Sequence, residues 1–209
     1  MSALLSRVLT AGLLLAVFVP AAVWAPTWAW GVLMAGVIGM AAFEWARLSH
    51  FSLFAARAYA VSLTLAALVL PVLTGAAWPS AQTGLTAFAI VFWIAIAPLW
   101  LWRRWAALAA PVRAVTGIVL LLPAWAALMA LHVRGPGILL GVMAGVWIAD
   151  SAAYFVGRRF GRHKLAPTIS PGKSWEGVAG ALVALMLYGV ALNGFAGLPL
   201  WPLLPLLAV

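Results

Sequence analysis

The feature that most constrains this chain is a series of apolar stretches, each close to 20 residues long. About 20 residues of α-helix cross the ~30 Å hydrocarbon core of a bilayer, so such stretches are typical of transmembrane helices. Hydrophobic residues make up 67% of the 209 residues and charged residues only 7%, whereas soluble domains have about a quarter charged residues. The sequence therefore predicts an all-α fold, a polytopic helical integral membrane protein.

Glycine, proline and charged residues separate these stretches, as expected at the ends of spans. We expect about seven complete spans, an eighth that begins near residue 198, and a single transmembrane domain over residues 1–209. The 13 tryptophans lean toward the span ends, which is typical of an interfacial aromatic belt. The predicted spans are residues 8–25, 28–46, 58–77, 84–102, 114–132, 137–156 and 177–194.

Basic residues fall almost entirely on one set of alternating loops. Eleven of the 12 lysines and arginines lie near the N-terminus or in residues 47–57, 103–113 and 157–176, and the other set of loops holds only Arg134. The positive-inside rule then predicts a cytoplasmic N-terminus and a cytoplasmic 157–176 loop. Because topology accounts for the net charge of +9, we expect no nucleic-acid partner.

Asp150 is one of only three acidic residues, and it lies inside the predicted span 137–156. An ionised carboxylate at the centre of a membrane helix costs about 2.5–3.5 kcal/mol on insertion scales, so it should face protein or a water-filled cavity. Tyr154 shares its face of the helix, and Gly141 and Gly145 allow close approach of a neighbouring helix. A ligand or metal role is favoured over the alternative, a structural ion pair with an arginine.

A dense basic cluster follows Asp150. On its own, this cluster is explained by topology or by contact with anionic lipid. We interpret Arg158 and its neighbours as part of the loop that follows the span. The cluster consists of Arg158, Arg159, Arg162, His163 and Lys164.

The next segment, SPGKSWEG, favours a phosphate ligand. Ser170 to Gly172 have the composition of a turn, Ser174 can cap the following helix, and Glu176 would lie in its first turn. Backbone N–H groups of residues 172–175 would then be free to bind an anion, and Lys173 adds a positive charge.

Glu44 has a simpler interpretation. It precedes Arg47 by three residues, and a local pair on the helix surface would account for it.

The segment WIADSAAYFVGRRFGRHKLAPTISPGKSWEGVAGAL, residues 147–182, resembles the phosphatidate cytidylyltransferase (CDP-diacylglycerol synthase) family. The segment FEWARL at residues 43–48 is similar to part of that family in a weaker way. The resemblance implies a transferase of phospholipid biosynthesis that converts CTP and phosphatidate to CDP-diacylglycerol and pyrophosphate with Mg²⁺. It also implies a bacterial inner-membrane location, with the motif loop and the flanking helix ends on the cytoplasmic side.

Carried onto this chain, the resemblance implies that Asp150 and Lys173 are catalytic and that Asp150 is also a metal ligand. The expected partners are CTP, phosphatidate and the lipid bilayer, and a homodimer remains an option for the assembly. The implied substrate-binding residues are Arg158, Arg159, Lys164, Ser170, Gly172, Ser174 and Glu176.

The family's acidic downstream segment is absent from this sequence, so we expect a C-terminally truncated chain whose own activity is open. With three carboxylates, a two-metal centre is not expected from these residues alone. The alternative function is a non-catalytic transporter or channel for an anionic solute, which would need polar residues along several helices. An inactive remnant that only packs in the membrane is a third reading.

Overall fold

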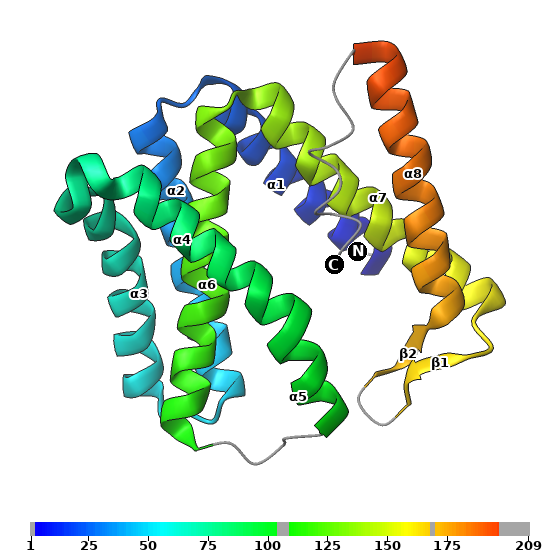
Figure 1. The fold of residues 1–209 in the computed structure, drawn as a ribbon, viewed down its shortest axis with the longest axis horizontal. Helices are drawn as coiled ribbons and strands as arrows, with labels where there is room; N and C mark the ends of the chain where they lie inside the picture. The colour runs from blue at the N-terminus through cyan, green and yellow to red at the C-terminus, as the bar shows by residue number, and fades with distance from the viewer. Residues whose placement is uncertain (1–2, 104–108, 168–169, 197–209) are drawn as a thin grey trace. The chain divides into compact units, whose positions relative to one another are not determined.

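The computed structural model describes residues 3–103, 109–167 and 170–196 (Figure 1). These residues are helical apart from one two-stranded hairpin. Five segments are long and apolar enough to cross a membrane: Thr27–Leu48, Leu53–Trp100, Ala110–Val133, Pro136–Phe160 and Trp175–Gly194. The predicted eighth span lies outside the described residues. The elements are α1 (Ala3–Trp24), α2 (Thr27–Leu48), α3 (Leu53–Thr74), the 3₁₀ turn η1 (Gly75–Ala77), α4 (Trp78–Val91), the π-helical η2 (Phe92–Ile96), α5 (Ala97–Arg103), α6 (Ala110–Val133), α7 (Pro136–Phe160), β1 (Lys164–Ala166), β2 (Ser170–Ser174) and α8 (Trp175–Ala196).

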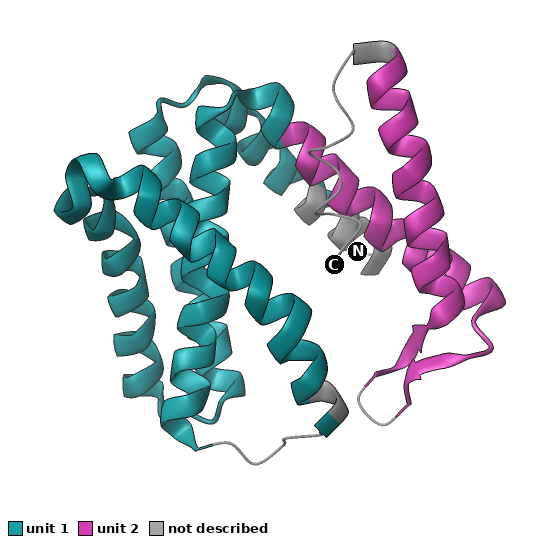
Figure 2. Ribbon diagram, viewed as in Figure 1, with its two compact units in different colours: residues 1–139 teal, residues 140–209 magenta. Residues whose placement is uncertain are grey.

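The chain divides into two compact units, residues 1–139 and 140–209 (Figure 2). In the first unit α2 packs against α3 and α6, and α4 packs against α6. The prediction of a single transmembrane domain stays a prediction.

Two tryptophans tie α2 to α6 in the core of the first unit. Trp30 Nε1 donates to Leu128 O at 3.3 Å, and Trp125 Nε1 donates to Gly31 O at 3.2 Å. Trp30 is 0% exposed, so it packs in the core of this unit rather than on its surface. The physical reason is that an indole can be buried when its N–H finds a carbonyl acceptor.

The second unit contains most of α7, the β1–β2 hairpin and α8. The hairpin is antiparallel, with Lys164 opposite Ser174 and Ala166 opposite Ser170. Between these pairs β1 has one residue and β2 has three, so β2 bulges at residues 171–173. The predicted turn at Ser170 to Gly172 is therefore wrong, because pairing with β1 extends these residues into a bulged strand.

Candidate functional site

The helices α7 and α8 meet at glycines close to the hairpin. A Cβ added at Gly177 would lie 2.9 Å from the backbone oxygen of Ala153, and one added at Gly157 would lie 3.1 Å from Ser174 Oγ. Such close spacing favours residues that lack a side chain, as at other close crossings of membrane helices. Further along the same pair, Tyr188 donates to Gly141 O at 2.9 Å, so a tyrosine side chain reaches α7 there. The predicted close approach of a helix at Gly141 and Gly145 stays a prediction.

Ser174 caps α8, as predicted. Its hydroxyl accepts the backbone N–H of Gly177 at 3.2 Å, the position expected of an N-cap side chain. The residue is only 4% exposed, between Gly157 and Gly177. Ser174 thus fixes where β2 ends and where α8 begins.

Glu176 and His163 hold the start of the hairpin against the first turn of α8. Both carboxylate oxygens of Glu176 accept the backbone N–H of His163, at 3.1 and 3.2 Å, and Oε1 lies 2.6 Å from the His163 ring Nδ1. The backbone oxygen of His163 accepts the N–H of Trp175 at 2.9 Å. The prediction of free backbone N–H groups at residues 172–175 is therefore wrong at Trp175, because its N–H donates a hydrogen bond to a loop carbonyl.

The basic residues divide between the helix and the hairpin. Arg158 and Arg159 lie in the last turn of α7 rather than in a loop, since the helix runs on to Phe160. Cationic side chains are favourable there because the carboxyl end of a helix carries partial negative charge. Arg158 Nη1 donates to Tyr154 Oη at 3.0 Å. Lys164 lies in β1 and Lys173 in the β2 bulge, and both are exposed.

Asp150, Tyr154 and Arg158 follow one another at intervals of four residues on α7. They form a stripe about 12 Å long at 1.5 Å per residue. Asp150 is exposed on its unit and makes no ion pair or hydrogen bond within the described residues. The alternative of a structural ion pair with an arginine therefore finds no support in the part of the chain that is described.

The remaining candidates, Ser170 and Gly172, lie in β2. Gly172 is exposed, and no atom lies within 4 Å of where its Cβ would be. In residues 3–103, 109–167 and 170–196, no group of three or more His, Asp or Glu residues could hold a metal ion. Asp150 thus belongs to no such group among these residues.

Sequence reasoning gave His163 no role beyond its charge. Its partner Glu176 is 13 positions away, so no local spacing marks the contact. A helix-capping pattern predicts the role of Ser174, but it does not predict that the Glu176 side chain holds the loop at His163.

The membrane-length helices and the basic hairpin beside the carboxylate-bearing α7 define a multi-pass helical membrane protein with a candidate phosphate-binding surface. The chain belongs to the cytidylyltransferase family, whose model matches residues 5–209. This finding confirms the family resemblance.

Among curated proteins, the chain is 40% identical over 162 residues to the phosphatidate cytidylyltransferase of Pseudomonas aeruginosa, covering 70% of this chain and 54% of that protein. It is 57% identical over 54 residues to the phosphatidate cytidylyltransferase of Haemophilus influenzae, covering 26% of this chain and 19% of that protein. The chain thus spans about half the length of the first of these relatives, and less of the second. No solved structure matches it.

Proposed function

We propose that this chain carries the motif region of a phosphatidate cytidylyltransferase, which transfers the CMP group of CTP to phosphatidate and releases pyrophosphate. The observation that carries the proposal is the exposed basic hairpin, fixed to α8 by the Ser174 cap and the Glu176–His163 contact. A surface that holds several cations in fixed positions suits a triphosphate, whose transfer depends mainly on positioning and charge neutralisation.

The topology belongs to the same proposal. Leu53–Trp100 is helical over 48 residues, or about 72 Å at 1.5 Å per residue, which is more than twice the ~30 Å of a bilayer core. Gly75 has a φ of +49° at the turn between α3 and α4, so we infer that this segment crosses twice. With α1 this gives seven spans. The basic hairpin would face the cytoplasm of a bacterial cell, where CTP is found.

In the reaction, a phosphate oxygen of phosphatidate attacks the α-phosphorus of CTP. A P–O bond forms to the lipid phosphate, the bond between the α-phosphorus and its bridging oxygen breaks, and pyrophosphate leaves with those electrons. Lys173 would stabilise the charge that develops on the phosphates. Ser174 and Glu176 would position the hairpin through their contacts at the start of α8. The substrate phosphates would be held by Arg158, Arg159, Lys164, Ser170 and Gly172.

Asp150 fits Mg²⁺ as one carboxylate ligand, with water and substrate phosphates completing the shell, which is a common way for proteins to hold this ion. Bound there, Mg²⁺ would neutralise phosphate charge. The other acidic side chain of the second unit, Glu176, is already engaged by His163.

Pairing of two copies of the chain is a further part of the proposal, and light scattering of the purified protein measures it.

The test uses membranes that contain this chain. We expect labelled CTP to enter the organic phase as CDP-lipid, and a photoreactive CTP analogue to label the chain. Lys173→Ala and Asp150→Asn should abolish turnover, and Lys173→Ala should also reduce labelling. Arg134→Ala, which removes an exposed cation from the other set of loops, is the matched control. Absence of both turnover and labelling in the unsubstituted chain would contradict the proposal.

The transporter alternative has little support from the described helices. The third, fourth and fifth predicted spans hold few polar side chains, and five of their hydroxyls each donate to a carbonyl four residues earlier in their own helix. They are therefore turned to the backbone rather than to a continuous path. These residues are Ser62, Thr64, Thr74, Thr86 and Thr116.

A further inference from the structure

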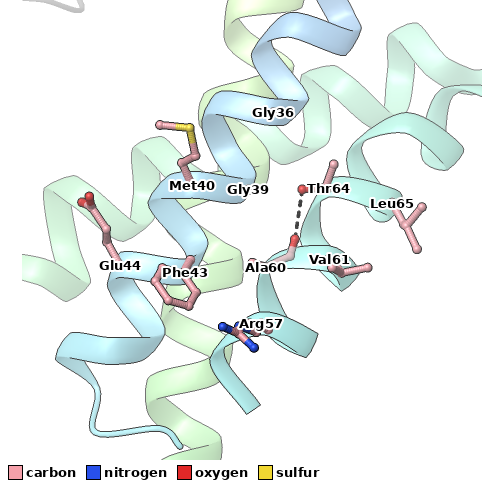
Figure 3. Close-up of a pocket in the computed structure, with 10 residues that line it drawn as sticks. All are labelled: Gly36, Gly39, Met40, Phe43, Glu44, Arg57, Ala60, Val61, Thr64 and Leu65. Atoms are coloured by element: carbon pink, nitrogen blue, oxygen red, sulfur yellow. Dashed lines mark hydrogen bonds between the residues drawn. The ribbon is translucent and has the colours of Figure 1, made fainter. Parts of the chain in front are cut away.

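A groove of about 520 Å³ lies between α2 and α3 in the first unit (Figure 3). Apolar side chains form most of its walls, including Met40 and Phe43 from α2 and Val61 and Leu65 from α3. Both helices belong to segments long and apolar enough to cross a membrane. The groove therefore runs along a membrane-embedded pair of helices.

Two glycines of α2 explain why the groove exists. At Gly39 the helices touch, because an added Cβ would overlap the hydroxyl of Thr64. At Gly36, one turn away, no atom lies within 4 Å of where a Cβ would be. Thr64 donates its hydroxyl to Ala60 O at 3.0 Å, so its polar hydrogen is satisfied within α3 (Figure 3). The floor beside Gly36 is thus open and apolar.

The two charged residues of the groove lie at the same end. Glu44 lies four residues before the end of α2 and Arg57 lies four residues after the start of α3, on either side of the short connection 49–52. Figure 3 shows them on opposite helices, with Phe43 between them. Both are exposed, and neither makes an ion pair or hydrogen bond within the described residues.

The predicted pair between Glu44 and Arg47 is not formed. Arg47 Nη1 instead donates to Phe51 O at 3.1 Å, because the chain turns back at His50, where φ is +62°. The turn brings a carbonyl within reach of the guanidinium. This leaves the Glu44 carboxylate available at the mouth of the groove.

We propose that the groove binds one molecule of phosphatidylethanolamine, with an acyl chain beside Gly36, the phosphate at Arg57 and the ammonium at Glu44. From Glu44 to Gly36 the helix rises about 12 Å, most of the ~15 Å depth of one leaflet. Charges of opposite sign at one mouth, both without a partner among the described residues, match a zwitterion. An anionic lipid would satisfy Arg57 but be repelled by Glu44, and a quaternary ammonium donates no hydrogen bond to the carboxylate.

Native mass spectrometry of the full chain tests this, after exposure to an equimolar mixture of phosphatidylethanolamine, phosphatidylglycerol and phosphatidylcholine in detergent. We expect one phosphatidylethanolamine to be retained in excess. Glu44→Gln should lower its excess over phosphatidylglycerol about fivefold, and Arg57→Gln should lower retention of all three lipids by a similar factor. Gly36→Leu should remove the bound lipid by filling the groove.

Gly84→Leu is the matched control, because it adds the same side chain to a helix glycine that also has open space around it. It should leave lipid retention unchanged. Circular dichroism checks the fold of each variant, and the two charge variants decide the matter if Gly36→Leu is misfolded. Equal retention of the three lipids by the unsubstituted chain, or an excess of phosphatidylglycerol or phosphatidylcholine, would overturn the proposal.

Discussion

Glu176 holds His163 at two points, with Oε1 2.6 Å from the ring Nδ1 and both oxygens accepting the backbone N–H. The contact joins the first turn of α8 to the residue just before β1. Because Lys164 follows His163 directly, this contact also fixes where the basic hairpin starts. A residue expected to bind substrate is thus engaged in holding the loop.

Replacing Glu176 with alanine should loosen the hairpin. Hydrogen bonds to a charged group are stronger than those between neutral groups, so backbone amides of the hairpin should exchange faster with deuterium once they are lost. Hydrogen-exchange mass spectrometry of the chain in detergent measures this. Lys173→Ala, which removes an exposed side chain from the same hairpin, should leave the exchange rates unchanged. Equal rates in Glu176→Ala and the unsubstituted chain would show that the contact does not hold the hairpin.

The glycine contact between α7 and α8 makes a second prediction. Gly177→Ala places a methyl group 2.9 Å from Ala153 O, and overpacking of this kind costs about 1–3 kcal/mol. We expect a lower free energy of unfolding in a denaturant titration followed by circular dichroism. Gly84→Ala is the control, since its Cβ would meet nothing within 4 Å. Equal losses of stability in the two variants would argue against a tight crossing.

A third prediction separates the cap from substrate binding. Ser174→Ala removes the acceptor for Gly177 N–H, and loss of an N-cap typically costs about 1 kcal/mol. Ser174→Asp supplies another capping oxygen but adds bulk and charge at a site that is 4% exposed. If Ser174 only caps, Ser174→Ala should lower stability while the labelling by the CTP analogue at saturating concentration is unchanged. A loss of labelling with unchanged stability would instead indicate direct contact with the nucleotide.

Sequence patterns located the helices but missed several ends, and each error has a local cause. The predicted span 58–77 begins after the charged Arg57, yet α3 begins at Leu53, where Ser52 caps it by accepting the Ala55 N–H at 3.2 Å. The gap between the predicted spans 58–77 and 84–102 contains Pro79, but this residue lies in the first turn of α4, where a proline costs no hydrogen bond. Charge and proline therefore placed two helix starts too late, at residues 58 and 84 rather than 53 and 78.

The candidate site was predictable only where its interactions are local. The Ser174 cap follows from a serine three residues before Gly177. The hairpin does not follow from local sequence, because its strand pairing places Lys164 opposite Ser174, ten residues later and beside a bulge. Turn-forming residues such as Pro171 and Gly172 also occur in bulged strands, so composition alone placed the turn wrongly.

The two tryptophan contacts between α2 and α6 make the last prediction. Trp30→Phe keeps an aromatic ring but loses the indole N–H bond to Leu128 O, and a hydrogen bond of this kind contributes about 0.5–1.5 kcal/mol. The ring also stacks on His132, with centroids 5.0 Å apart, so the loss should exceed that of a surface substitution. Trp28→Phe, at a residue that is 73% exposed, is the control and should be nearly neutral. Thermal unfolding of the two variants side by side measures the difference, and equal midpoints would mean that Trp30 is not part of the core.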